Sequence, residues 1–210
     1  MKIIALLRTA LFLSAMMTAF TARADTYNVL VMGDSIGAAY GLAEDDGWVS
    51  LAEKTLLEEG LDVSFTNASI TGDTTAGGLR RLPEAIDRFK PDLVVIELGG
   101  NDGLRGYQPS TMQQNLQGMA DIARNGGADV LIAGMMIPSN YGPAYRKMFS
   151  DAFVSAAQNT DSALLPFLLE PIATDRDYFQ SDGIHPTADA QPLIMQHVLP
   201  LIRQFVSGDD

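Results

Sequence analysis

Short apolar runs alternate with helix-like patterns along most of this chain, and that alternation restricts its fold more than any other feature. Runs of four apolar residues at 29–32, 93–96 and 130–133 are separated by segments in which apolar residues recur every three or four positions. The run 93–96 contains no polar residue, as in a strand that is covered on both faces. This repeated strand–helix order predicts a parallel β-sheet with helices on both sides.

We therefore predict an α/β fold, a flavodoxin-like three-layer α/β/α sandwich built on a five-stranded parallel sheet. Weaker β-type segments at 61–65 and 163–167 supply the remaining two strands. Right-handed crossovers wind such strands into one sheet, for which we expect the order 2-1-3-4-5. The length of 210 residues suits one domain, and the chain shows no linker or internal repeat.

The first part of the chain reads as a secretory signal peptide rather than as part of this domain. Two basic residues precede an apolar stretch that runs to Phe20, and residues 22–24 fit the small-x-small cleavage pattern. We expect cleavage after Ala24, which divides the chain into a signal peptide at 1–24 and a single folded domain at 25–210. The apolar stretch is short for a membrane span of about 20 residues, so an uncleaved anchor is the less favoured alternative. These features predict a periplasmic or secreted protein without stable membrane insertion.

Charge and composition exclude several classes of function. Cleavage would remove three of the 14 Lys and Arg residues and none of the 26 Asp and Glu residues, which leaves a formal charge of −15. Such a surface repels nucleic acids, so we expect no nucleic-acid partner. The chain has no cysteine and only two histidines, which excludes a thiolate nucleophile and a zinc–thiolate site and argues against a histidine-rich metal site. We expect no cofactor.

A serine stands where the first predicted strand ends, in the segment Gly-Asp-Ser-Ile-Gly at 33–37. Open α/β sheets carry their chemistry at the carboxyl edge of the strands, which is where Ser35 would lie. A serine hydroxyl needs a neighbouring base, and imidazole has a suitable pKa. His185 follows Asp182 by three residues, so one helical turn would place both side chains on one face. Asp182 would then orient the ring of His185 toward Ser35.

Donors for a developing oxyanion are expected at the same edge. Asn101 follows the third predicted strand through two glycines, which allow close approach of the backbone. Gly72 lies beyond the second predicted strand and offers a backbone N–H. With the backbone N–H of Ser35 these residues make three donors.

Other interpretations of the same residues were weighed. Taken singly, the Gly-Asp-Ser and Gly-Gly-Asn-Asp segments are also ordinary turn sequences, and His197 fits a core position on the last predicted helix. The string at 33–37 matches the nucleophile elbow of α/β-hydrolases. In that fold several strands precede the nucleophile, whereas Ser35 follows the first strand here. A metallophosphoesterase would need several more histidine ligands.

The four blocks around Ser35, Gly72, Asn101 and Asp182–His185 resemble those of the SGNH, or GDSL, hydrolase family, in the family's order and across nearly all of residues 25–210. The first block departs from the family pattern because Ile36 stands where leucine is usual. The resemblance implies a catalytic triad of Ser35, Asp182 and His185 and an oxyanion hole of Ser35, Gly72 and Asn101. The second block and the segment Asn140–Gly142 are most similar to the branch that hydrolyses acyl thioesters, lysophospholipids and aryl or alkyl esters.

We therefore expect a monomeric serine esterase and thioesterase that acts on a small acyl ester, thioester or lysolipid. The acyl group should lie in an apolar groove, and the segment 138–145 should close over it. Two alternatives stay open: a carbohydrate acetylesterase with a polar cleft, and an acyl-binding protein without turnover. The residues expected to line the groove, unless they belong to the core, are Ile36, Leu104, Met136, Ile137, Pro138, Tyr141, Gly142 and Ile184.

Overall fold

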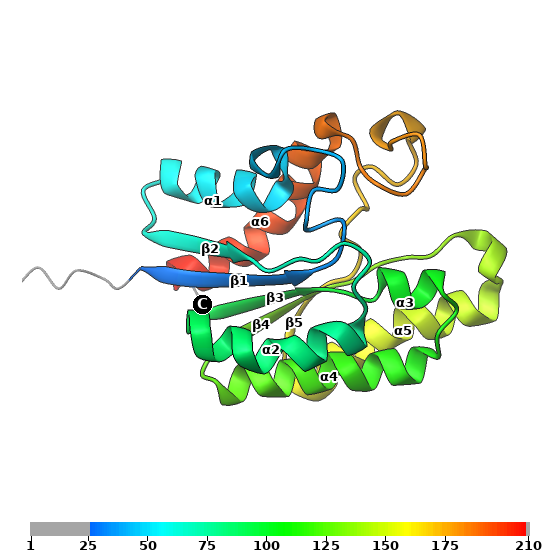
Figure 1. Ribbon diagram of the computed structural model, residues 1–210, viewed down its shortest axis with the longest axis horizontal. Helices are drawn as coiled ribbons and strands as arrows, with labels where there is room; N and C mark the ends of the chain where they lie inside the picture. Colours follow the sequence, from blue (N-terminus) through cyan, green and yellow to red (C-terminus); the bar gives the residue numbers. More distant parts are fainter. Residues whose placement is uncertain (1–25, 209–210) are drawn as a thin grey trace, which may run out of the picture.

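Five parallel strands form a single sheet with the order β2-β1-β3-β4-β5, as predicted (Figure 1). The computed structural model describes residues 26–208, so the predicted signal peptide lies outside the described residues. The strands are β1 (Tyr27–Gly33), β2 (Val63–Asn67), β3 (Leu93–Glu97), β4 (Asp129–Ala133) and β5 (Ala163–Leu165).

Helices cover both faces of the sheet and make the predicted α/β/α sandwich (Figure 1). One face carries α1 (Trp48–Glu58) and α6 (Gln191–Ser207), and the other carries α2 (Thr75–Phe89), α4 (Pro109–Asn125) and α5 (Pro143–Thr160). The short helix α3 (Gly100–Leu104) follows β3 directly. Single 3₁₀ turns lie at η1 (Glu44–Asp46), η2 (Ser139–Tyr141), η3 (Arg176–Tyr178) and η4 (Ala188–Ala190). No helix within residues 26–208 has the length and apolarity needed to cross a membrane.

The core lies on both faces of β3, where every residue is buried. Trp48 of α1 fills one side, while Phe149 and Phe153 of α5 fill the other with their rings edge to face at 5.3 Å. Because α/β packing leaves no face of a central strand in water, its sequence is continuously apolar rather than alternating. The exception in β3 is its last residue, Glu97, which is fully buried.

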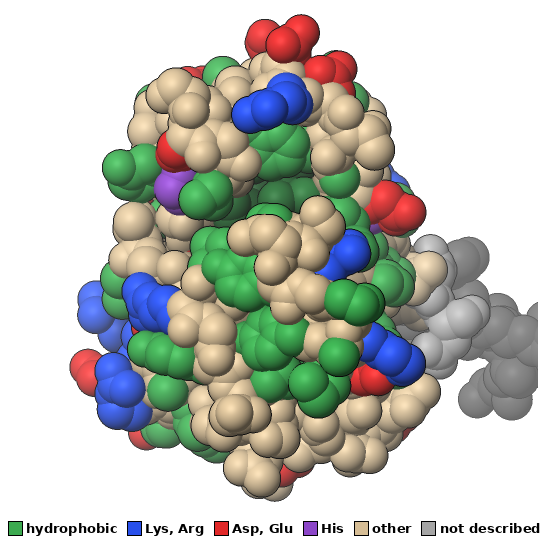
Figure 2. Space-filling view, turned by 90° about the vertical axis from the view of Figure 1, so that its right-hand side faces the viewer, with side chains coloured by type: hydrophobic (Ala, Val, Ile, Leu, Met, Phe, Trp, Pro, Cys, Tyr) green, Lys and Arg blue, Asp and Glu red, His purple; other side chains and the backbone are tan. Residues whose placement is uncertain are grey.

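The parallel strands all end at one edge of the sheet, and the segments that follow them converge there. Ser35 comes two residues after β1, Gly72 lies in the connection between β2 and α2, and Asn101 is the second residue of α3, which follows β3. The segment 182–185 returns to the same edge before α6. This edge faces the viewer in Figure 2, where hydrophobic side chains surround a hollow.

Several local details differ from the sequence analysis. The second strand begins two residues later than expected, and the fifth ends two residues earlier. The segment 138–145 is not a continuous loop, because η2 occupies its middle and α5 begins at Pro143. His197 is half-buried on α6, and its Nε2 lies 3.1 Å from the carbonyl oxygen of Phe167, which agrees with the structural role considered for it.

Candidate active site

The structure brings Ser35, His185 and Asp182 into one hydrogen-bonded chain. Nε2 of His185 lies 2.9 Å from Oγ of Ser35, and Nδ1 lies 2.7 Å from Oδ2 of Asp182. Residues 182–185 form a turn rather than the helical turn expected, and Oδ1 of Asp182 accepts hydrogen bonds from the amides of Ile184 and His185. The two carboxylate oxygens of Asp182 therefore have different partners: Oδ1 binds the backbone of the turn, and Oδ2 binds the imidazole.

The environment of Asp182 keeps its carboxylate ionised. The hydrogen bond from the His185 side chain, followed by the two backbone amides, lowers the pKa of Asp182 to about 2. An ionised acceptor at Nδ1 favours the tautomer with the proton on Nδ1, so that Nε2 presents its lone pair to Ser35. Tyr40 lies against the imidazole, with ring centroids 4.3 Å apart and the ring planes tilted by 37°, and so limits its rotation.

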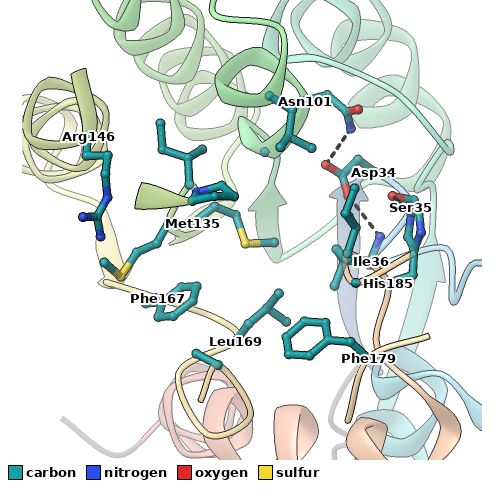
Figure 3. A pocket seen from close by; sticks show the side chains of 18 of the residues that line it. Asp34, Ser35, Ile36, Asn101, Met135, Arg146, Phe167, Leu169, Phe179 and His185 are labelled. Atoms are coloured by element: carbon teal, nitrogen blue, oxygen red, sulfur yellow. Dashed lines mark hydrogen bonds between the residues drawn. The ribbon is translucent and has the colours of Figure 1, made fainter. Parts of the chain in front are cut away.

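The three expected oxyanion donors lie on adjoining segments. The amides of Ser35 and Gly72 make no hydrogen bond to another backbone group of residues 26–208. Gly72 has a φ of +79°, a conformation that favours glycine, and its carbonyl accepts a hydrogen bond from Arg105 at 2.9 Å. Nδ2 of Asn101 donates one hydrogen bond to Oδ2 of Asp34 at 2.9 Å, and an amide NH₂ carries a second hydrogen (Figure 3).

Asp34 is a site residue that the sequence analysis treated only as part of a motif. It is buried beside the nucleophile, where Oδ1 accepts from the amide of Ile36 at 3.0 Å and Oδ2 accepts from Asn101. Burial raises the pKa of Asp34 to about 6, although these two hydrogen bonds act in the opposite direction. Asp34 thus joins the turn at 33–37 to the side chain of Asn101.

Glu97, at the end of β3, is another site residue that was not expected from the sequence. Its side chain holds the backbone of the turn at 33–37. Its Oε2 accepts from the amides of Asp34 at 3.2 Å and Gly37 at 2.9 Å, while its Oε1 has no partner among the described residues. Burial, and next the charge of Asp34, hold the pKa of Glu97 well above its usual range. The sequence signal that could have identified Glu97 is an acid placed directly after the four apolar residues at 93–96.

Glu97 leads to a prediction about the pH dependence of stability. Because its folded-state pKa is raised, the folded protein retains a proton that the unfolded chain releases above about pH 4. This contribution makes stability fall as the pH rises above about 4, and Asp34 acts in the same sense up to about pH 6. Glu97→Gln removes the titrating group, so its Tm should decline less between pH 4 and pH 7 than that of the wild type.

The measurement is thermal unfolding over that pH range, with Glu58→Gln as the control. Glu58 is exposed on α1, so this control makes the same Glu→Gln substitution without changing a buried carboxyl. Its curve should run parallel to the wild-type curve. If the Glu97→Gln curve were also parallel, the raised pKa would be wrong.

A third buried acid, Asp102, ties together the two segments that contain Gly72 and Asn101. Asp102, which follows Asn101, accepts from the amide of Thr75 at 2.9 Å and from its hydroxyl at 2.6 Å. Thr75 is the first residue of α2 and lies three positions after Gly72. These two hydrogen bonds connect the start of α2 with α3 and so help to fix the spacing of Gly72 and Asn101.

An apolar cavity of about 520 Å³ opens beside Ser35 (Figure 3). Such a volume is typical of sites for small molecules. Six of the residues expected there line it, namely Ile36, Leu104, Met136, Ile137, Pro138 and Ile184. Further lining residues that were not expected from the sequence lie on the segments after β4 and β5 and on α5, including Met135, Arg146, Phe167, Leu169 and Phe179.

Two residues expected at the groove do not line this cavity. The hydroxyl of Tyr141 donates to the carbonyl oxygen of Leu104 at 2.7 Å, which ties η2 to the end of α3. Gly142 connects η2 to α5 with a φ of +81°. Both residues therefore support the wall that contains Ile137 and Pro138. Within residues 26–208, no group of three or more His, Cys, Asp or Glu side chains is arranged to hold a metal ion.

A serine–histidine–aspartate array at the edge of this α/β/α sandwich defines a serine hydrolase. Comparison with known families agrees, because the profile of the GDSL-like Lipase/Acylhydrolase family matches residues 31–192. The chain belongs to this family, also called the SGNH hydrolases, and it is an ester hydrolase.

Relatives of known name support this assignment. The chain is 49% identical to "Esterase TesA" of Pseudomonas aeruginosa, over 89% of this chain and 92% of that protein. It is 37% identical to "Thioesterase 1/protease 1/lysophospholipase L1" of Escherichia coli K12, over 92% and 91%. Among solved structures, the psychrotrophic esterase EstA from Pseudoalteromonas sp., inhibited by monoethylphosphonate, is 38% identical, with a TM-score of 0.82 over 86% of this chain and 98% of that chain.

Proposed function

We propose that this chain hydrolyses acyl esters and thioesters through an acyl-enzyme on Ser35. The observation that carries the proposal is the chain of short contacts from Ser35 through His185 to Asp182, at the end of an apolar cavity. A hydroxyl, a base and an orienting carboxylate in this order are what acyl transfer requires. The cavity offers room for the acyl group beside the reacting hydroxyl.

In the first half of the reaction, Oγ of Ser35 attacks the acyl carbonyl carbon while Nε2 of His185 takes its proton. Asp182 stabilises the imidazolium that forms, and its own low pKa keeps it from taking that proton. The carbonyl oxygen becomes an oxyanion. The backbone amides of Ser35 and Gly72 and the side-chain amide of Asn101 donate hydrogen bonds to it.

His185 then gives its proton to the departing alkoxide or thiolate, and the acyl group remains on Ser35. Water enters, loses a proton to Nε2 of His185 and attacks the acyl carbon. Collapse of the second tetrahedral intermediate returns the proton to Ser35 and releases the carboxylic acid. The chemistry thus needs no group beyond those in the protein and water.

The apolar lining of the cavity restricts the class of substrate that it can bind. Its walls include Ile36, Ile137, Phe167 and Leu169, so it favours an acyl chain over an acetylated sugar, for which a polar, open cleft would be expected. The names of the relatives add aryl esters, acyl thioesters and lysophospholipids as candidates. We expect a monomer that binds such small molecules, without nucleic acid or a cofactor.

We further propose that residues 1–24 direct export and that the active protein begins at Asp25. The support is the basic start, the apolar stretch and the small residues at 22 and 24. The N-terminal mass of protein recovered from the periplasm or medium tests this. Protein that keeps Met1 and stays cell-associated would contradict it.

Covalent labelling tests the proposed chemistry. A fluorophosphonate probe reacts only with an activated serine, so one equivalent should add to the protein, and peptide mapping should place it on Ser35. Prior treatment with a slowly hydrolysed ester should delay labelling. An acyl-binding protein without turnover would stay unlabelled, and rates on acyl thioester, aryl ester, lysophospholipid and acetylated sugar would then rank the substrate classes.

A further inference from the structure

Arg146 places a cation at one end of the acyl cavity. Figure 3 shows its guanidinium on the side away from Ser35 and His185, with apolar side chains between the two ends. Met135, Phe167 and Leu169 are among these intervening residues. The cavity thus joins a reacting hydroxyl to a positive charge through an apolar stretch.

The guanidinium of Arg146 lacks an acidic partner in the described part of the chain. Within residues 26–208 no carboxylate oxygen lies within 4.0 Å of it, and its buried Nε makes no hydrogen bond. The next residue, Lys147, differs because it pairs with Asp151 at 2.6 Å. The guanidinium as a whole therefore has no charged partner among the described residues, and an anionic acceptor that enters the cavity would supply one.

We infer that Arg146 binds a carboxylate at the far end of the acyl chain. The substrate class is then the monoesters and monothioesters of dicarboxylic acids, in which a methylene chain separates the reacting carbonyl from a free carboxylate. This inference rests on the proposed function, because it requires the acyl carbonyl at Ser35.

The chemistry of both partners fits this assignment. The planar guanidinium presents N–H donors in a fork that matches the two oxygens of a carboxylate. The methylene chain suits the apolar walls between the two ends, and their low polarity strengthens the ion pair. The protein has a formal charge of −12, so a general attraction for anions is absent and a local cation is needed to select an acid.

The experiment compares pairs of p-nitrophenyl esters that differ only at the far end of the acyl chain. Hexanoate, octanoate and decanoate are matched with the monoesters of the dicarboxylic acids of equal length, at pH 7.5. The measured quantity is the ratio of kcat/KM for the acid-terminated ester to that for the neutral ester. At the best chain length, Arg146→Gln should lower this ratio roughly 10- to 100-fold, mainly through KM.

Two further variants separate recognition from general electrostatics. Arg146→Lys keeps the charge but loses the fork, so it should restore only part of the ratio. Lys147→Gln removes one positive charge from the adjacent position and should leave the ratio unchanged. Equal losses in Arg146→Gln and Lys147→Gln would indicate a diffuse charge effect and overturn the inference.

The neutral esters distinguish failure of this inference from failure of the proposed function. If wild-type protein hydrolyses neither member of a pair, the proposed function is wrong. If it hydrolyses the neutral esters and the ratio is the same in Arg146→Gln as in the wild type, only the role of Arg146 is wrong. Turnover of the neutral ester by each variant also shows that the variant is folded.

Discussion

Replacing Ser35 by alanine is expected to lower kcat for a short p-nitrophenyl ester by about 10⁴- to 10⁶-fold. The loss is large because the substitution removes the atom proposed to form the acyl-enzyme, and within residues 26–208 the side chain of His185 makes no hydrogen bond to another hydroxyl. The oxyanion donors remain, so a small rate above that of water should persist. Steady-state kinetics with enzyme in large amount measures this residual rate.

Ser64→Ala is the matched control for this substitution. Ser64 is exposed on β2, so its loss removes a hydroxyl from a strand without touching the cavity. Both variants should keep the wild-type circular dichroism spectrum, because Ser35→Ala removes one small atom. Full turnover by a folded Ser35→Ala protein would exclude the proposed mechanism.

Asp182→Asn is expected to lower kcat by about 10⁴-fold while the fold is retained. The structure explains why an uncharged residue of the same shape should fail. Oδ1 of Asp182 accepts from the amides of Ile184 and His185, so the carbonyl of an asparagine would take that position and direct its NH₂ group at Nδ1. The imidazole would then carry its proton on Nε2 and could not accept one from Ser35.

The same variant has an effect on acid stability whose sign follows from the lowered pKa. The pKa of Asp182 is about 2, below that of an unfolded aspartate, so its contribution to stability is present above about pH 4 and is lost as the pH falls toward 2. Asp182→Asn should therefore lose less stability over this range than the wild type. Asp177→Asn, which changes an exposed acid on η3, is the control for charge and should be indistinguishable from the wild type in both kcat and acid unfolding.

Much of the fold was predictable because its signals are local. Apolar runs and helical periodicity each extend over a few residues, and the rules that arrange parallel strands then leave few topologies. The order of the five strands is confirmed on this basis. The ends of β2 and β5 were misplaced by two residues because the ends of strands depend on hydrogen bonds to neighbours, which periodicity does not describe.

The supporting residues of the site were less accessible to sequence analysis. Glu97 contacts Gly37 across 60 positions, and Asn101 contacts Asp34 across 67. Each residue has ordinary explanations when taken alone: an acid at the end of a strand, an asparagine in a glycine-rich turn. Only their proximity shows that buried carboxyl groups hold the turn at Ser35 and the side chain of Asn101 together.

The sequence by itself determined the class of fold, the family and the residues at which chemistry was expected, because strand ends and the Asp182–His185 spacing are local features. The tertiary structure alone decided what surrounds them. It showed that Asp182 holds a turn as well as the imidazole, that Tyr141 supports the wall behind the cavity, and that Arg146 stands at its far end. The physical reason is that burial, hydrogen-bond partners and cavity walls arise from segments that meet only when the chain folds.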